Sequence, residues 1–513
     1  MSDGIPRSLR ACRLLLLVPL ALAVCVAFAP LGRARERGAI RPRGPIVLAV
    51  GGPTGAPAIA PGFLGLSLEY WALPGYAGSN PSAVDPVFVQ LIRNLAGRYP
   101  PQLRIGGYTT DITWRPRPGL GRPAGASYAL TRRWIAVARS LAATLGARLI
   151  LGINLEADSP AVAATEADAL VRGIGRERVE ALELGNEPEL YGIFNWGVSN
   201  ATGRPPGYGF GDFENDFARI ARALPDVPLA GPSLAGGAIG TSGWFQYLGR
   251  FLSDQPRVAV ATVHRYPLQQ CYVSPTQPDY PTIANLLAPA ASRALAASVA
   301  GVVKTAHAHR VPVRIDEMNT DSCGLVPSVT DSFASALWAL DALFSMAGVG
   351  VDGVNIHTYP LAGASLFGFH RVQRRWRATV QPEYYGLQMF AQAAPAGSRL
   401  LRVSPAGTAH LEVWATRALD HTIRIVVINE SSRARTVELR LRATVAAGTL
   451  ERLEAPSLSA RRGVTLGGQS FGTSTPTGLL AGPVRTSAVA WSARGYVFRV
   501  AAGSAAMLTL PPG

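Results

Sequence analysis

The sequence predicts an α/β fold, a (β/α)8 barrel joined to an all-β domain, on the strength of three observations. From about residue 63 to residue 393, short apolar segments alternate with amphipathic helical segments. Strands that are apolar throughout and separated by helices are typical of a parallel sheet covered on its outer face. This unit occurs eight times, over a length that suits a closed barrel. After about residue 398 the pattern changes to alternating residues punctuated by turns, which indicates an all-β domain.

Eight segments are predicted as barrel strands: 63–69, 103–106, 148–154, 179–184, 228–232, 258–264, 311–316 and 351–357. Helical periodicity is clearest in 131–146, where apolar side chains recur every three or four residues, and again in 328–347. An open doubly wound sheet is the alternative to a barrel. It is disfavoured because no glycine-rich phosphate loop follows the first strand.

The C-terminal part is predicted to be a β-sandwich. Its strand-like segments are 410–416, 422–429, 436–441, 488–491, 495–500 and 505–510. The segment 46–60, which precedes the first barrel strand, also has a β pattern and is expected to complete the sandwich. The expected organisation is therefore an N-terminal segment 1–43, a sandwich strand segment 44–62, a barrel 63–397 and a sandwich 398–513.

The first 43 residues differ in kind from the rest. Arginines at positions 7, 10 and 13 precede an apolar run, 14–29, and a basic stretch continues to residue 43. A basic region before an apolar run of this length is typical of an export signal. The small residues Ala27 and Ala29 could form a cleavage site, but Pro30 follows them, so an uncleaved membrane anchor is the alternative. Both place the folded part outside the cytoplasm, as a secreted, periplasmic or cell-envelope protein.

The net charge bears on which partners the chain could bind, and the cysteines bear on whether it forms a disulfide. The formal net charge is +16, and the segment 1–43 alone holds eight Arg against two acidic residues, which leaves about +10 for the rest. Such an excess could favour an acidic polysaccharide, whereas no Arg run interleaved with aromatic residues suggests nucleic acid. Only Cys271 and Cys323 remain beyond the N-terminal segment. An oxidising compartment permits a disulfide between them, and two buried thiols are the alternative.

Polar side chains stand where the predicted strands end, and active sites of (β/α)8 barrels lie at that end. In chain order they are Glu69, Asp111, Asn186, Glu187, Tyr266, Glu317 and Tyr359. Strands four and seven occupy opposite sides of an eight-strand ring, so Glu187 and Glu317 can face each other. A lone Glu at a strand end is usually a solvated loop residue, but Leu-Gly-Asn-Glu-Pro after strand four combined with Ile-Asp-Glu-Met-Asn after strand seven favours catalysis.

Two facing carboxyl groups suit the cleavage of a glycosidic bond. One must be protonated, to donate to the leaving oxygen, and the other ionised, to attack the anomeric carbon. We predict Glu187 as acid/base and Glu317 as nucleophile, with retention of configuration if the groups lie about 5–5.5 Å apart. Asn186 is placed to hydrogen-bond the sugar 2-hydroxyl, and Tyr266 to hydrogen-bond the nucleophile.

The remaining polar residues receive weaker predictions. Glu69 and Asp111 are expected to bind substrate hydroxyls, with a structural role as the alternative. His264 and His357 are expected to be hydrogen-bonded structural residues. No group of His, Cys and carboxylate residues has the sequence spacing of metal ligands, so neither a metal nor any other cofactor is expected.

At these motifs the sequence resembles glycoside hydrolase family 79, the heparanase and β-glucuronidase family. The residues that carry the resemblance are 63–69, 104–107 with Asp111, 185–188, and 316–319 with 322–324. It covers nearly all of the chain after the N-terminal segment. It implies a barrel with a β-sandwich, a retaining glucuronidase with Glu187 as acid/base and Glu317 as nucleophile, and contacts from Glu69 and Asp111 to the sugar in the −1 site.

The resemblance also implies how a uronic acid is held. Its carboxylate is expected to bind backbone amides and tyrosines of the loop after strand eight, 357–368, where Tyr359 is the candidate. Two alternatives remain: a related retaining enzyme acting on neutral β-glycosides, and a non-catalytic envelope protein that binds glycans. A degenerate binding protein would be expected to have lost one of the two glutamates, and both are present.

Overall fold

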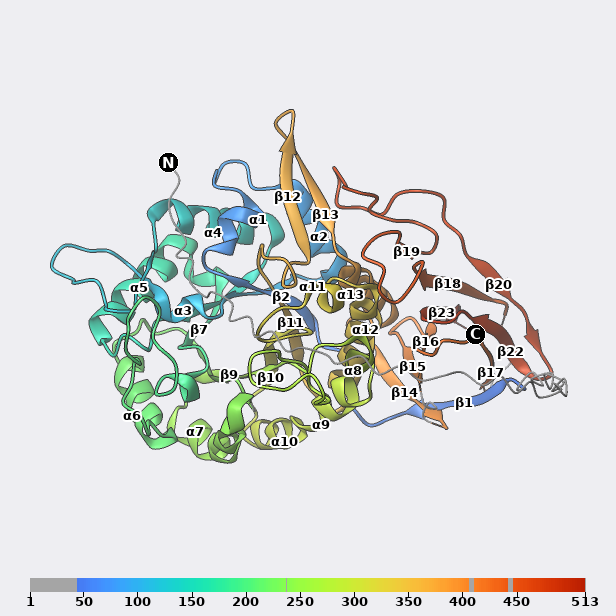
Figure 1. The fold of residues 1–513 in the computed structure, drawn as a ribbon, viewed down its shortest axis with the longest axis horizontal. Helices are drawn as coiled ribbons and strands as arrows, with labels where there is room; N and C mark the ends of the chain where they lie inside the picture. Colours follow the sequence, from blue (N-terminus) through green and yellow to red (C-terminus); the bar gives the residue numbers. More distant parts are fainter. Residues whose placement is uncertain (1–43, 237, 406–409, 442–445, 513) are drawn as a thin grey trace, which may run out of the picture. The chain divides into compact units, whose positions relative to one another are not determined.

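The computed structural model describes residues 44–512 apart from 237, 406–409 and 442–445 (Figure 1). The predicted export signal or anchor, 1–43, lies outside the described residues. From Pro45 onward the described chain forms one compact unit. Within it, no helix combines the length and the hydropathy that crossing a bilayer requires.

Eight parallel strands close into a barrel in the order β10-β11-β2-β3-β6-β7-β8-β9. Their bounds are β2 (Leu64–Glu69), β3 (Gln102–Gly106), β6 (Arg148–Ile153), β7 (Val179–Leu184), β8 (Leu229–Leu234), β9 (Val258–Arg265), β10 (Val313–Met318) and β11 (Gly353–Thr358). Every predicted barrel segment contains one of these strands, so the (β/α)8 (TIM) barrel is confirmed. All residues of β2, β10 and β11 are buried, because side chains fill the barrel interior and helices cover its outside.

Three of the outer helices begin after a residue whose side chain accepts hydrogen bonds from the first turn. The outer helices are α2 (Pro86–Ala96), α4 (Arg132–Leu145), α5 (Pro160–Ile174), α6 (Phe210–Ala221), α7 (Leu248–Asp254), α10 (Ala300–Ala308), α12 (Phe333–Gly348) and α13 (Pro382–Ala393). In α4, Thr131 accepts a hydrogen bond from the Trp134 amide, and Gly146 ends the helix in the left-handed conformation. The predicted helix 131–146 is therefore confirmed almost to its ends.

The other predicted helix, 328–347, is interrupted. It consists of α11 (Pro327–Thr330) and then α12, because the backbone of Ser332 is extended and serves as the cap of α12. Helix α12 is buried on nearly all faces, since it packs against the barrel and against the C-terminal domain. Phe344 stacks on Trp414 of that domain with ring centroids 5.5 Å apart.

The C-terminal domain is a sheet of eleven strands, antiparallel except for one pair, around its own apolar core. Its main strands are β14 (Arg399–Ser404), β15 (Leu411–Arg417), β16 (Ile423–Asn429), β17 (Arg435–Leu441), β18 (Gly448–Glu454), β22 (Gly495–Val500) and β23 (Ser504–Leu510). Short strands β19 (Thr465–Leu466), β20 (Ser487–Val489) and β21 (Trp491–Ser492) lie at its edges. The predicted all-β domain is confirmed, although β14 and β18 were missed because charged residues interrupt their apolar pattern.

Strand β1 (Ile46–Pro53) belongs to the C-terminal sheet and not to the barrel. It lies between β14, with which it is antiparallel, and β17, with which it is parallel. The chain therefore contributes a strand to the outer domain before it enters the barrel. The predicted β segment 46–60 is confirmed only for its first half.

Candidate active site

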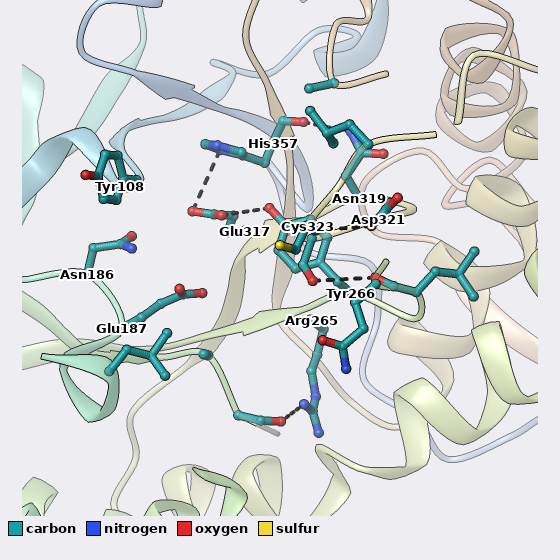
Figure 2. Close-up of a pocket in the computed structure, with 18 of the residues that line it drawn as sticks. Tyr108, Asn186, Glu187, Arg265, Tyr266, Glu317, Asn319, Asp321, Cys323 and His357 are labelled. Atoms are coloured by element: carbon teal, nitrogen blue, oxygen red, sulfur yellow. Dashed lines mark hydrogen bonds and ion pairs between the residues drawn. The ribbon is translucent and has the colours of Figure 1, made fainter. Parts of the chain in front are cut away.

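The carboxyl ends of all eight barrel strands enclose a cavity of about 740 Å³ (Figure 2). Each of the seven side chains predicted from the sequence lines it. They are Glu69, Asp111, Asn186, Glu187, Tyr266, Glu317 and Tyr359. The barrel thus gathers into one site residues that are spread over nearly 300 positions of the sequence.

Glu187 lies in a turn that holds its backbone in an unusual conformation. Its φ and ψ are 52° and 54°, in the left-handed region that few non-glycine residues adopt. Pro188 follows it and disfavours the right-handed helical alternative. The Glu187 amide donates to the carbonyl of Ser233 on β8, at 2.9 Å, and this fixes the turn. Such backbone outliers cluster at functional sites because the surrounding structure must impose them.

Glu317 lies on β10 and accepts two strong hydrogen bonds. Tyr266 donates its hydroxyl to Oε1 at 2.7 Å, and Arg104 donates from Nη1 to Oε2 at 2.6 Å. Burial alone would raise the pKa of Glu317, but the charges of His357, His264 and Arg104 and the Tyr266 hydrogen bond lower it well below its ordinary value. Glu317 is therefore ionised at neutral pH.

The two glutamates face the same open space, as Figure 2 shows. One carboxylate oxygen of Glu187 lies within 4.8 Å of one carboxylate oxygen of Glu317. Their environments differ: the Glu187 side chain is 24% exposed, whereas that of Glu317 is 10% exposed. His264 lies beneath both, with Nδ1 2.8 Å from Glu187 Oε1 and 3.8 Å from Glu317 Oε2. The arrangement brings two carboxyl groups of unequal exposure to one sugar-sized gap.

Together with His264, this pair forms a group of three side chains that could hold a metal ion. Their other contacts argue against a cation there. Glu317 already accepts hydrogen bonds from the cationic Arg104 and from Tyr266. Although burial lowers the pKa of His264, the charges of Glu317 and Asp316 outweigh it and raise the pKa well above its ordinary value, so the imidazole is cationic. Two cations beside the gap disfavour a third.

Arg104, on β3, is the centre of the fully buried charge network beneath the site. Its guanidinium donates to Glu183 Oε2 at 2.7 Å, to Glu317 Oε2 at 2.6 Å and to Asn186 Oδ1 at 2.9 Å, and it lies 3.4 Å from Asp316 Oδ2. Burial would lower the pKa of Arg104, but these carboxyl groups raise it well above its ordinary value. Arg104 therefore orients two side chains: the carboxylate of Glu317, the proposed nucleophile, and the side-chain amide of Asn186, which precedes the proposed acid/base.

Replacing Arg104 by Met should destabilise the fold by about 3–5 kcal/mol at neutral pH, since it leaves buried carboxylates without their cation. Without that cation the folded-state pKa values of these acids rise above their unfolded values. The penalty is then largest at alkaline pH and shrinks as the pH falls toward 5. Denaturant unfolding at pH 5 and pH 8 measures this. The control is Arg139→Met, at an exposed position of α4, and an equal loss at both pH values would contradict the prediction.

Glu69 and His357 form the wall of the cavity on the β2 and β11 side. The Thr109 amide donates to Glu69 Oε2 at 2.9 Å, and the Thr109 hydroxyl bonds the same oxygen. Glu69 Oε1 lies 3.3 Å from His357 Nε2, and His357 Nδ1 lies 2.9 Å from the Ser67 hydroxyl. Glu69 thus keeps Oε1 toward the cavity, where a substrate hydroxyl can reach it.

Asp111 lines the cavity, and both of its carboxylate oxygens accept hydrogen bonds from the protein. Its Oδ1 accepts the amides of Leu155 and Glu156, and its Oδ2 accepts the Asn186 amide at 2.9 Å and the Tyr191 hydroxyl at 2.7 Å. Four donors occupy both oxygens, so the contacts of Asp111 hold the turn that precedes Glu187. It lines the cavity, but its carboxylate already has the partners of a positioning residue.

Cys271 and Cys323 are joined by a disulfide. It links the loop after β9, which begins at Tyr266, to the loop after β10, which follows Glu317. The Cys323 carbonyl also accepts the Gln270 amide at 2.8 Å, so the two loops are joined twice. Cys323 lines the cavity, and the bridge therefore forms part of its wall.

Sequence reasoning missed the residues that support the site from below. Arg104, Glu183, Asp316 and Ser233 are fully buried and were not predicted. Arg104 contacts Glu317 and Asn186, and the other three contact Arg104. A signal was present, because Arg104 and Glu183 interrupt apolar strands, and charged residues are rarely buried without partners. The two histidines expected to be structural, His264 and His357, are hydrogen-bonded as expected. Both also contact a proposed catalytic carboxylate.

No protein-family model and no curated protein matches this chain. Solved structures do resemble it. A 4-O-α-L-rhamnosyl-β-D-glucuronidase from Fusarium oxysporum 12S is 17% identical, with a TM-score of 0.65, over 91% of this chain and 100% of its own. A GH51 arabinofuranosidase from Xanthomonas axonopodis pv. citri is 14% identical, with a TM-score of 0.60, over 91% and 100%.

A GH39 enzyme from Xanthomonas axonopodis pv. citri is 17% identical, with a TM-score of 0.54, over 93% of this chain and 100% of its own. These neighbours are named as glycoside hydrolases, and the similarity spans both the barrel and the C-terminal domain. At such low sequence identity the likeness establishes the fold that they share with this chain. The chemistry must be argued from the side chains of the site.

Proposed function

We propose that this chain is a retaining glycoside hydrolase in which Glu187 is the acid/base and Glu317 the nucleophile. The observation that carries the proposal is the facing pair of carboxyl groups in unlike environments. Glu317 is held ionised by Arg104, Tyr266 and two histidines, whereas Glu187 lies nearer to the solvent. One carboxylate oxygen of each lies within 4.8 Å of the other, which favours direct attack over the gap of about 6.5–9.5 Å that an inverting enzyme needs for water.

The reaction then has two steps. In the first, a Glu317 oxygen attacks the anomeric carbon while protonated Glu187 donates to the glycosidic oxygen, so that bond breaks and a glycosyl ester forms on Glu317. In the second, ionised Glu187 takes a proton from water, which attacks the anomeric carbon and releases Glu317. Asn186, oriented by Arg104, donates its amide to the sugar 2-hydroxyl. Tyr266 keeps the charge on the attacking carboxylate in place.

The finer proposal is a β-glucuronidase of the family 79 type that acts on glucuronides or acidic glycans. It is supported by the motifs around Glu69, Asp111, Glu187 and Glu317, and by a structural neighbour named as a glucuronidase. We also propose export of the chain, because a disulfide between Cys271 and Cys323 suits an oxidising compartment. The alternatives are an enzyme for neutral β-glycosides and a non-catalytic glycan-binding protein.

One observation favours the neutral-glycoside alternative. The loop after β11 has few amides left for a uronic carboxylate, since those of Tyr359, Leu361, Ala364 and Ser365 all donate to carbonyls within the loop. The Leu366 amide donates to the Thr358 hydroxyl. The phenol of Tyr359 lines the cavity and is a side-chain donor that the loop offers there.

A panel of aryl β-glycosides tests the proposal. The purified chain is assayed on the β-glucuronide, β-glucoside and β-xyloside of 4-nitrophenol. The preferred sugar is then supplied as its 2-deoxy-2-fluoro inactivator, and the labelled peptide is located by mass spectrometry. We expect the label on Glu317. A label on another residue would exclude the mechanism, preference for a neutral sugar would favour the alternative enzyme, and glycan binding without turnover or labelling would identify a binding protein.

A further inference from the structure

Arg265 is the only arginine or lysine that lines the cavity, among the part of the chain that the structure describes. The same lining carries seven carboxyl groups, among them Glu187, Glu317 and Asp321. The ionised members of this set, Glu317 among them, repel an anionic group on a substrate. Arg265 is the one lining side chain with a permanent positive charge that could attract such a group.

The position of Arg265 is set by its strand. It is the last residue of β9, between His264, which contacts Glu187, and Tyr266, which contacts Glu317. Figure 2 shows its guanidinium on the opposite side of the Glu187–Glu317 pair from His357 and Tyr108. Two proposed glycone contacts, Glu69 and Tyr359, lie beside His357, so in the proposed arrangement Arg265 lies on the leaving-group side.

The contacts of Arg265 leave its charge without a counter-ion. It donates from Nη1 to the Gly236 carbonyl and from Nη2 to the Ser298 hydroxyl at 2.7 Å, and it lies over the Phe245 ring at 5.3 Å. Its Nε is buried without a hydrogen-bond partner. Among the described residues, Glu189 is the one carboxyl group whose charge acts on Arg265. The guanidinium is thus held by neutral groups only.

Glu189, the acidic residue whose charge acts on Arg265, does not neutralise the guanidinium. Burial and the charge of Glu187 raise the pKa of Glu189 to about 8, so that carboxyl group is mostly neutral at pH 7. Burial lowers the pKa of Arg265 to about 10, and Glu189 offsets only part of the effect. Arg265 is still cationic at neutral pH, and an arriving anion would gain an interaction that nothing in the cavity now supplies.

We infer that Arg265 is a specificity-determining residue, which selects substrates carrying an anionic group, such as a carboxylate or sulfate, on the leaving-group side of the scissile bond. The inference rests on the proposed glycosidase function. Under this inference, the negative charge of a substrate is recognised at the end of β9. The loop after β11 is not its site, because the amides of that loop are largely engaged. A charged aglycone would then be preferred whichever sugar occupies the other side.

Two aryl glycosides that differ only in the leaving group test this: the 4-nitrophenyl and the 3-carboxy-4-nitrophenyl glycoside of the preferred sugar. The wild-type protein should favour the carboxylated substrate in kcat/KM. In Arg265→Gln the ratio of the two kcat/KM values should fall by about tenfold or more, as expected for one charge-assisted hydrogen bond. Arg265→Lys should keep part of the preference, and Arg139→Gln all of it. The preference should weaken as salt is raised.

Titration calorimetry on Glu317→Gln protein with the same two glycosides gives a second readout that needs no turnover. Equal affinities there, or equal kcat/KM ratios in wild type and Arg265→Gln, would overturn the inference. So would equal losses in Arg265→Gln and Arg265→Lys, since packing rather than charge would then explain them. If instead Glu317→Gln turned over as fast as wild type while the ratio still followed Arg265, the proposed catalytic mechanism would fail and the anion site would stand.

Discussion

Glu317→Gln should lower kcat on the preferred aryl β-glycoside by on the order of 10⁴-fold or more. The amide cannot attack the anomeric carbon, and losing a covalent nucleophile removes a whole chemical step. The fold should survive, because Gln has the same shape as Glu. Its amide oxygen can still accept from Arg104, and its NH2 group can donate to the Tyr266 hydroxyl. Steady-state kinetics with a chromogenic leaving group measures the loss.

The matched control is Glu177→Gln, at a position with a 66% exposed side chain outside the cavity. It should leave kcat within about twofold of wild type, because exposed substitutions away from a site rarely matter. Circular dichroism and thermal unfolding of both variants separate catalysis from folding. Retention of even a tenth of the wild-type rate by folded Glu317→Gln protein would remove Glu317 from the mechanism.

Glu187→Gln should give the second largest loss, and the size of the loss should depend on the leaving group. General acid catalysis contributes about 10²–10⁴-fold, and a poor leaving group needs the proton most. We expect the full loss on alkyl glycosides and a much smaller effect on the first step with 2,4-dinitrophenyl glycosides, whose phenolate leaves without help. With the second substrate the glycosyl ester should accumulate, because Glu187 no longer activates water.

Rescue by azide distinguishes this role from simple damage. A small anionic nucleophile needs no general base, so azide should restore turnover of the dinitrophenyl glycoside by Glu187→Gln and yield a β-glycosyl azide. The same addition should not rescue Glu317→Gln. Equal loss on both classes of leaving group, without rescue, would assign Glu187 a positioning role instead.

The barrel could be predicted because its strands are buried on all sides, whereas its helices are buried on one face only. Uniformly apolar segments such as 149–153 and a periodic helix such as 131–146 carry that difference in burial directly in the sequence. Helix 328–347 was only partly predicted. Helix α12 packs between two domains and therefore has no polar face that would mark it as amphipathic. Its start after Ser332 depends on the backbone geometry of that residue, which the spacing of apolar residues does not reveal.

The sequence predicted the site residues at the carboxyl ends of the strands. It did not predict the buried residues that lie beneath the cavity. Topology alone places Glu69, Glu187 and Glu317 around one cavity once a barrel is accepted. The roles of Arg104 and Asp111 depend on which side chains meet inside the barrel, over separations such as the 213 positions between Arg104 and Glu317. One sequence contains no measure of such contacts. The assignment of negative-charge recognition likewise required knowing which amides and cations already had partners.

Strand β1 imposes an order on biosynthesis. Both of its hydrogen-bonding neighbours, β14 and β17, lie beyond the entire barrel in the chain, so during vectorial synthesis β1 stays unpaired until the whole barrel and β14 have been made. Truncation after the barrel would leave this strand with an open edge, and such edges invite intermolecular pairing. The two domains therefore need to be synthesised together for β1 to pair. The barrel should not be expected to express well as an isolated fragment.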